Sequence, residues 1–294
     1  MLSFLSYFFS GLSLGSVYAI IALGYTMVYG IAKMLNFAHG DIIMVGGYVT
    51  FVACISMGLP APAGILLAMA ACTLLGVTIE RIAYKPLRGA NSLAVLITAI
   101  GVSYFLQNFA LLMFGADPKS FTSVVPIPPL KLFDNQLIIS GETISTIVCC
   151  IIIMTGLTTF ISKTKQGQAM LAVSEDKGAA TLMGINVNRT IALTFAIGSA
   201  LAAIAGVLLC SAYPTLTPTT GAMPGIKAFV AAVLGGIGSI PGALIGGLLL
   251  GILENLSKAY ISSKLSDAIV FSVLIIVLLV RPTGILGRKI MEKV

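Results

Sequence analysis

The sequence predicts an all-α integral membrane protein with about eight to nine membrane helices, some of them broken or half-length. Of its 294 residues, 58% are hydrophobic and only 9% are charged, whereas a soluble domain of this size carries roughly 25% charged residues. So few charges cannot cover a surface that faces water, and lipid must cover most of it. The chain also holds several apolar stretches near the roughly 20 residues that cross a bilayer. We therefore expect one transmembrane domain over residues 1–294.

Seven apolar stretches are candidate spans. The first lacks the basic residues that precede a cleaved signal peptide and is too long to be one, so we interpret it as a mature helix. The seven candidates are Leu5–Tyr29, Ile42–Met57, Pro62–Ile82, Leu93–Phe114, Ile138–Ile161, Ile191–Ser211 and Ala268–Val280.

Two regions interrupt the apolar pattern. Glycines and Pro241 divide the apolar residues between positions 222 and 256, and such residues break helices. We expect two shortened helices there, about Gly225–Leu234 and Gly242–Leu256, that meet inside the membrane. The run Asn36–Asp41 similarly interrupts the start of the second span.

Two short matches suggest a pseudo-repeat of two halves. Gly30–Lys33 resembles Gly225–Ala228, and each precedes an interruption and then a glycine pair, at 46–47 and 246–247. Paired broken helices in duplicated halves mark transport sites in several transporter folds. Chance similarity is the alternative explanation.

The basic residues predict the orientation. The net charge of +7 would suit a nucleic-acid partner, but these residues are scattered at the ends of apolar runs, which is typical of membrane topology signals and predicts no nucleic acid. Cytoplasmic loops carry an excess of Lys and Arg, and most of the 17 basic residues fall in one alternating set of loops. This places the C-terminus inside, the N-terminus and the Pro-rich loop 116–137 outside, and the segment 163–188 inside. The inner set comprises Lys33, Arg81, Lys85, Arg88, Lys163, Lys165, Lys177, Arg189, Arg281, Arg288, Lys289 and Lys293.

No pattern for catalysis, metal or cofactor binding is present. The five cysteines lie in apolar segments without metal-ligand spacing and are expected to be small buried hydrophobes. No Walker motif occurs, so ATP chemistry would have to come from another chain. No span carries a row of acidic residues for a proton or sodium relay.

The inner segment holds a short helix that is too short to cross the membrane. Ser174 is a suitable N-cap, acidic residues follow it, and Gly184 suits a left-handed stop. Small and apolar residues would share one face, which favours docking of another protein, with a solvated connector as the alternative. The residues assigned to this docking surface are Glu175, Asp176, Lys177, Gly178, Ala179, Ala180, Leu182, Met183, Gly184 and Asn186.

Two further groups are candidates for lining a translocation pathway. Ionisable residues at membrane depth are functional by default because their desolvation is expensive, which singles out His39 and Asp41. A gating or structural hydrogen bond is the favoured role for His39, the single histidine. Exposed amides of a glycine-rich loop can hold a carboxylate, with close helix packing as the alternative. The candidates are Asn36, His39, Gly40, Asp41, Gly46, Gly47, Gly235, Gly236, Gly238 and Ser239.

Several motifs together resemble a known family, the LivH-type permease subunits of bacterial ABC importers for branched-chain amino acids. The resemblance runs nearly from end to end and is weakest across 116–137. The matching stretches are Leu23–Gly30, Asn36–Gly40, Ile79–Pro86, Met183–Asn186, Ala228–Gly247 and Arg281–Gly287.

The resemblance implies an ABC importer permease fold in the bacterial inner membrane. It implies a heterodimer with a second related permease chain, two cytoplasmic ATPase subunits and a periplasmic binding protein that delivers the amino acid. The segment 174–186 would couple to an ATPase. A related ABC permease for urea, short-chain amides or other amino acids is the alternative. A secondary transporter is a further alternative, but it would need intramembrane charges, which the sequence nearly lacks.

Overall fold

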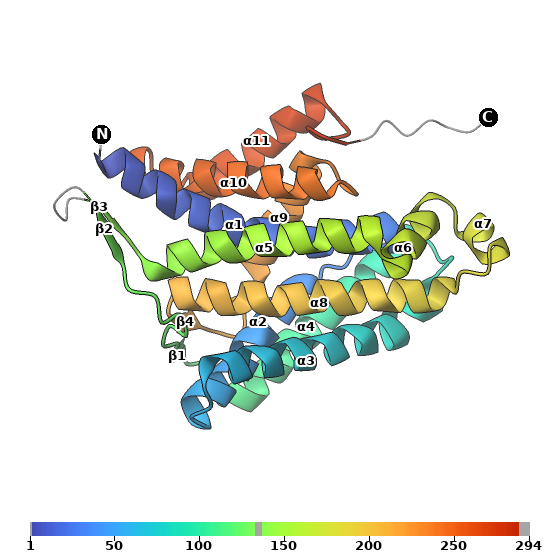
Figure 1. Ribbon diagram of the computed structural model, residues 1–294, viewed down its shortest axis with the longest axis horizontal. Helices are drawn as coiled ribbons and strands as arrows, with labels where there is room; N and C mark the ends of the chain where they lie inside the picture. Colours follow the sequence, from blue (N-terminus) through green and yellow to red (C-terminus); the bar gives the residue numbers. More distant parts are fainter. Residues whose placement is uncertain (1, 133–136, 288–294) are drawn as a thin grey trace.

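The computed structural model describes residues 2–132 and 137–287, which form a helical bundle with four very short strands (Figure 1). Within these residues, seven helices are long and apolar enough to cross a membrane. Two shorter apolar helices, α9 (Ala222–Gly235) and α11 (Ser266–Val280), accompany them. The predicted fold class is therefore confirmed. The seven long helices are α1 (Leu2–Ala32), α2 (His39–Thr50) with a π-helical end (Phe51–Ser56), α3 (Ala61–Ile79) with π and 3-10 ends (Glu80–Tyr84 and Lys85–Leu87), α4 (Ser92–Phe114), α5 (Gly141–Lys163), α8 (Val187–Ala212) and α10 (Ile240–Tyr260).

The two ends of the bundle differ. The short helices α6 (Lys165–Glu175) and α7 (Lys177–Leu182) lie at one end, which we call the inner end, and the strands lie at the other, the outer end (Figure 1). The loop 116–137 contributes strands to the outer end, while its residues 133–136, like Arg288, Lys289 and Lys293, lie outside the described residues. The strands form two antiparallel pairs, β1 (Lys119–Ser120) with β4 (Thr215–Leu216) and β2 (Leu130–Leu132) with β3 (Leu137–Ile139).

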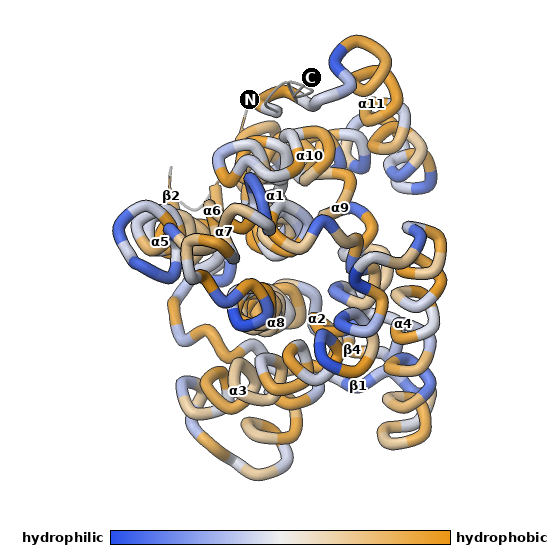
Figure 2. Tube along the Cα trace, turned by 90° about the vertical axis from the view of Figure 1, so that its right-hand side faces the viewer, coloured by the Kyte–Doolittle hydropathy of each residue, from blue (hydrophilic) through white to orange (hydrophobic). Residues whose placement is uncertain are grey.

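The core is built around α1, which α5, α8, α9 and α10 surround (Figure 2). Its closest neighbour is α10, and small residues allow the two backbones to touch. A Cβ added to Gly247 would lie 2.5 Å from the Cα of Ala19, and one on Gly11 would lie 2.9 Å from the Cα of Ile252. Small residues are the usual means of close helix contact in membranes, where apolar burial drives association little.

The outer helices α3, α4 and α5 bury few of their residues, and the partly or fully exposed ones are largely apolar. Leu112 of α4, for instance, is 84% exposed. An apolar surface of this kind requires lipid or another membrane chain against it.

The predicted break between positions 235 and 242 exists, but its expected form is wrong. The chain reverses through Gly236 and Gly238, whose φ angles are 107° and 92°, and Ser239 then caps α10 by accepting a hydrogen bond from the Gly242 N–H. A Cβ on Gly30 would lie 3.5 Å from Gly238, so this turn sits beside the inner end of α1. Since α10 is a full span, only α9 is shortened, and the two helices do not meet halfway through the bundle.

The two short sequence matches occupy different places in the fold. Gly30–Lys33 ends α1, with Lys33 in a left-handed conformation (φ 59°), whereas Gly225–Ala228 lies within α9. The two helices that do resemble each other in placement, and that touch, are α2 and α9. Each begins partway along the bundle, α2 after a segment that enters from the inner end and α9 after one that enters from the outer end.

Candidate functional site

The N-terminal ends of α2 and α9 meet in the interior of the bundle. A Cβ on Gly225 would lie 2.7 Å from the Cα of Gly40, and a Cβ on Gly221 would overlap the Gly40 carbonyl oxygen. Only glycine permits this contact at the three positions. From the crossing, α2 runs to the outer end, where Tyr48 stacks on Phe114, and α9 runs to the inner end. The crossing therefore separates an outer half of the bundle from an inner half.

The predicted polar residues of the broken second span are all buried. His39 is 1% exposed, and its Nε2 has no hydrogen-bond partner among the described residues. Its imidazole lies edge-on to Tyr25 and fills the space beside Gly24, so a Cβ on that glycine would overlap the ring. Asp41 is 2% exposed and accepts a 2.9 Å hydrogen bond from Gln107 of α4. Both residues thus lie well inside the bundle and not at its inner surface.

Asn36 lies closer to the inner end and borders a small cavity. Its side-chain oxygen accepts a 2.9 Å hydrogen bond from Tyr84, at the end of α3. The cavity, of about 10 Å³, has otherwise mainly apolar walls from α1, α9 and the segment before α2, including Tyr25, Phe229 and Ile237. The structure thus brings Asn36 next to the turn after α9, which joins the two predicted pathway groups.

Most of the predicted glycines serve close packing. A Cβ on Gly46 would lie 2.8 Å from the Cα of Ala203 in α8, and a Cβ on Gly47 would lie about as close to the side chains of Cys210 and Leu216. Gly235 lies against Gly242, and the chain after α11 joins this turn through hydrogen bonds from Ile285 N–H and Leu286 N–H to the carbonyls of Leu234 and Gly235, each 2.9 Å. The described contacts of these glycines favour the packing interpretation, and lining of a pathway stays a prediction for them.

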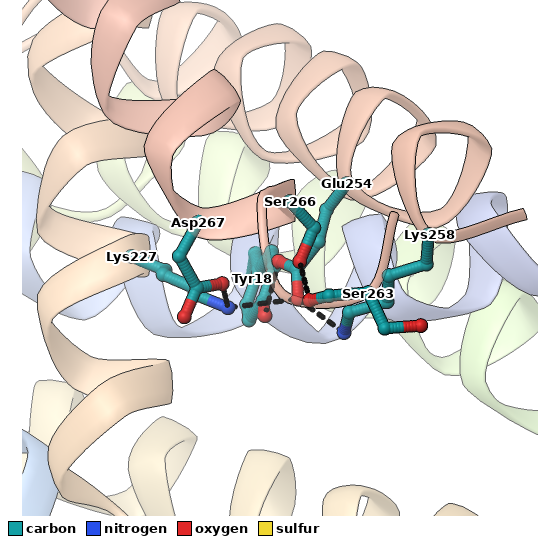
Figure 3. Close-up of polar contacts among 7 residues, drawn as sticks. All are labelled: Tyr18, Lys227, Glu254, Lys258, Ser263, Ser266 and Asp267. Carbon is teal, nitrogen blue, oxygen red and sulfur yellow. Dashed lines mark hydrogen bonds and ion pairs between the residues drawn. The ribbon is translucent and has the colours of Figure 1, made fainter. Parts of the chain in front are cut away.

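A buried cluster of charges was missed in the sequence (Figure 3). Lys227 of α9 is 6% exposed, and its Nζ lies 2.8 Å from Glu254 Oε1 and 2.7 Å from Asp267 Oδ1. Glu254, 1% exposed, also accepts hydrogen bonds from Lys258 (2.6 Å) and the Tyr18 hydroxyl (2.8 Å). The expectation that intramembrane charges are nearly missing is therefore wrong. One sequence feature could have predicted this cluster. Lys227 and Glu254 lie within apolar stretches, and charged residues are costly at membrane depth unless they are paired.

The inner segment folds as two helices, so the single helix predicted from Ser174 is wrong. Ser174 lies in the last turn of α6, where its hydroxyl donates to the Leu171 carbonyl. Asp176 is the actual N-cap, because its Oδ1 accepts hydrogen bonds from the N–H groups of Gly178 (2.7 Å) and Ala179 (3.0 Å). The predicted stop is confirmed, with Gly184 at a φ of 80°.

The tip of this segment exposes large apolar side chains. Leu182 is 91% exposed and Met183 is 82% exposed, while Ala180 is buried against the bundle and Ala179 is exposed. Asn186 caps α8 by accepting a 3.0 Å hydrogen bond from the Arg189 N–H. The predicted residues therefore form one short, capped projection at the inner end.

This projection is tied to α1. Lys177 donates a 3.0 Å hydrogen bond from Nζ to the Ala32 carbonyl, at the C-terminal end of α1. Burial lowers the pKa of Lys177, and the nearby positive charges of Arg88 and Lys33 lower it further. The segment that follows Ala32 leads directly to Asn36 and the cavity, so α7 is joined to the interior through a few residues.

Comparison with known proteins decides the family. A family model described as the permease component of branched-chain amino acid transport systems matches residues 7–278. The chain belongs to this family. Among its relatives is the high-affinity branched-chain amino acid transport system permease protein LivH of Escherichia coli strain K12, 48% identical over the whole chain and 98% of LivH.

Other relatives in this family are similarly close. LivH of Salmonella typhimurium is also 48% identical, with the same coverage of both proteins. The permease protein BraD of Pseudomonas aeruginosa is 48% identical across 97% of this chain and 96% of BraD. The chain therefore spans nearly the full length of these permeases.

Proposed function

We propose that this chain is a transmembrane permease subunit of an ATP-driven importer that carries leucine, isoleucine and valine. The observation that carries the proposal is the projection at the inner end, where a capped helix presents Leu182 and Met183 almost fully to solvent. Two large apolar side chains in such a position suit insertion into a pocket of another protein. Family membership over nearly the whole length supports the substrate class.

The partners we propose follow from what this chain leaves incomplete. Its sequence has no Walker motif, so two cytoplasmic ATPase subunits would supply the hydrolysis and the chain itself is not an enzyme. The exposed apolar faces of α3, α4 and α5 leave room for a second, related permease chain as well as lipid. A periplasmic binding protein would deliver the amino acid to the outer end.

The coupling site we propose is α7 with its flanking residues, from Glu175 to Asn186. The hydrogen bond from Lys177 to the Ala32 carbonyl gives movement of α7 a direct route to the end of α1. The pathway we propose passes the crossing of α2 and α9, with Asn36, His39 and Asp41 on its inner side or beside it. The two helices can then rearrange at a crossing where glycines bring their backbones into contact.

The location we propose is the bacterial inner membrane, with the inner end in the cytoplasm. The basic residues of the segments 81–88 and 163–189 gather at this end, as the positive-inside rule requires. The C-terminus would then lie in the cytoplasm.

Reconstituted transport tests the proposal. The chain, its companion permease, the ATPase subunits and the binding protein would be placed in proteoliposomes with ATP on the ATPase side. We expect ATP-dependent uptake of leucine and no uptake of urea or acetamide. Uptake of urea or acetamide in place of leucine would favour the amide importers, and leucine uptake driven by an ion gradient without ATP would favour a secondary transporter.

A further inference from the structure

The charge cluster of Lys227, Glu254, Asp267 and Lys258 contacts Tyr18, near the middle of α1 (Figure 3). Lys227 is two residues beyond Gly225, which contacts the first turn of α2 at the helix crossing. Asp267 is in the first turn of α11, and the helix from there to Val280 is roughly 20 Å long at 1.5 Å per residue. The hydrocarbon core is about 30 Å thick. If Val280 ends at the inner boundary, Asp267 lies well below the outer one.

The two carboxylates that hold Lys227 are bound very differently. Glu254 is almost fully buried and accepts hydrogen bonds from three side chains, those of Lys227, Lys258 and Tyr18. The side chain of Asp267, by contrast, is 44% exposed. Glu254 is therefore a fixed partner of Lys227, whereas Asp267 can be replaced.

The helix that carries Asp267 is lightly attached to the bundle. In α11 only Ser266 and Val270 are buried, and the residues toward its C-terminal end, such as Leu279 and Val280, are about four-fifths exposed. Figure 1 shows α11 on the outside of α10, crossing it obliquely. Hydrogen bonds of Ile285 and Leu286 to the turn after α9 hold the C-terminal side of α11 in place, so the movement that withdraws Asp267 from Lys227 is a tilt of the N-terminal half of α11.

The exposure of Asp267 also shows where water must reach. A charged side chain at membrane depth faces the bundle interior or a water-filled space, because exposure to lipid is too costly. An exposed carboxylate at this depth therefore borders water, and the Nζ of Lys227 lies 2.7 Å from it. A small polar solute in that space would meet Lys227 and Asp267 together.

We infer that Lys227 anchors the carboxylate of the transported amino acid, and that Asp267 occupies this position while no substrate is bound. The inference rests on the proposed function, since it takes an α-amino acid as the substrate. Exchange of one carboxylate for another on Lys227 leaves the charge of the cluster balanced. The released Asp267 then faces the α-ammonium group of the same zwitterion, so both charged ends of the substrate find a partner.

Direct binding to the purified importer, without its binding protein, tests the inference. The probes are leucine and leucinamide, which has the same side chain and amine but no carboxylate. We expect the wild-type complex to prefer leucine, and Lys227→Met to weaken leucine binding at least tenfold and abolish the preference. Lys258→Met is the matched control, because Lys258 pairs with the same Glu254 oxygen and is expected to keep leucine binding within about threefold.

A second variant covers the case in which Lys227→Met fails to assemble. The double variant Lys227→Gln with Asp267→Asn replaces one ion pair with a neutral hydrogen-bonded pair, and we expect the same loss of preference. A wild-type complex that does not prefer leucine, or a Lys227 variant that binds leucine as the wild type does, would overturn the inference. ATP-driven leucine uptake by the wild type is measured in parallel. If the wild type transports leucine but the inference about Lys227 fails, the proposed function still stands; if it does not transport leucine, the proposed function fails.

Discussion

Truncation of Leu182 to alanine tests the proposed docking surface. The side chain is 91% exposed in the isolated chain, so its removal should leave the free energy of unfolding within about 0.5 kcal/mol of the wild-type value. If an ATPase pocket buries it, the contact contributes about 1.5–3 kcal/mol. Since each 1.4 kcal/mol is a factor of ten in affinity, we expect the ATPase subunits to bind roughly 10- to 150-fold more weakly.

The assay is titration of purified ATPase subunits onto the permease pair in nanodiscs, with thermal unfolding measured in parallel. Leu112→Ala provides the matched control, since Leu112 is a leucine of similar exposure (84%) on the apolar face of α4. It should leave ATPase binding unchanged. If Leu182→Ala and Leu112→Ala both bound the ATPase with wild-type affinity, α7 would not be the docking surface.

The remaining predictions concern the same segment, the helix crossing and the orientation. Ala179→Arg should abolish leucine uptake without loss of inserted protein, because a long cation cannot enter a packed interface. The control Ala90→Arg, in an exposed inner loop, should retain uptake, and equal uptake by the two variants would count against docking. Gly221→Ala should destabilise the chain by about 1–3 kcal/mol or more, because the added Cβ would overlap the Gly40 carbonyl of α2. The control Gly101→Ala adds a Cβ with no neighbour within 4 Å and should leave stability unchanged, and thermal unfolding in detergent measures both. In a background without native cysteines, Lys119→Cys should react with an impermeant maleimide from outside and Ala90→Cys only after permeabilisation, and the reverse labelling would invert the topology.

Apolar length and helix-breaking residues predicted most of the fold. Spans such as α4 and α5 match the predicted stretches within a few residues, because a helix must satisfy its own backbone in lipid. The turn after α9 was located correctly from its glycines. Its depth was not, because the position of Gly238 beside Gly30 depends on how α1 and α10 pack.

Local capping was only partly predictable. Ser174 and Asp176 are both good N-caps by residue type, and α6 continues through the serine because Val173 and Met170 are buried on the bundle side of the same helix. That tertiary contact moves the start of α7 to Asp176. The left-handed stop at Gly184 needed no such contact and was predicted correctly.

The charge cluster shows what pattern alone could not supply. Lys227 and Glu254 are 27 positions apart in the chain, and their contact depends on the reversal between α9 and α10. Asp267 joins them only because α11 lies against both helices. In the sequence Lys227 and Glu254 are single charges within apolar stretches, and only the fold places them beside Asp267.

The measurement that tests the central claim most directly is ATP-dependent uptake of radiolabelled leucine by proteoliposomes that contain this chain with its companion permease, the ATPase subunits and the binding protein. We predict uptake that requires ATP and the binding protein, that isoleucine and valine inhibit, and that urea does not inhibit. Leucine uptake of the same rate in proteoliposomes that lack this chain would contradict the account.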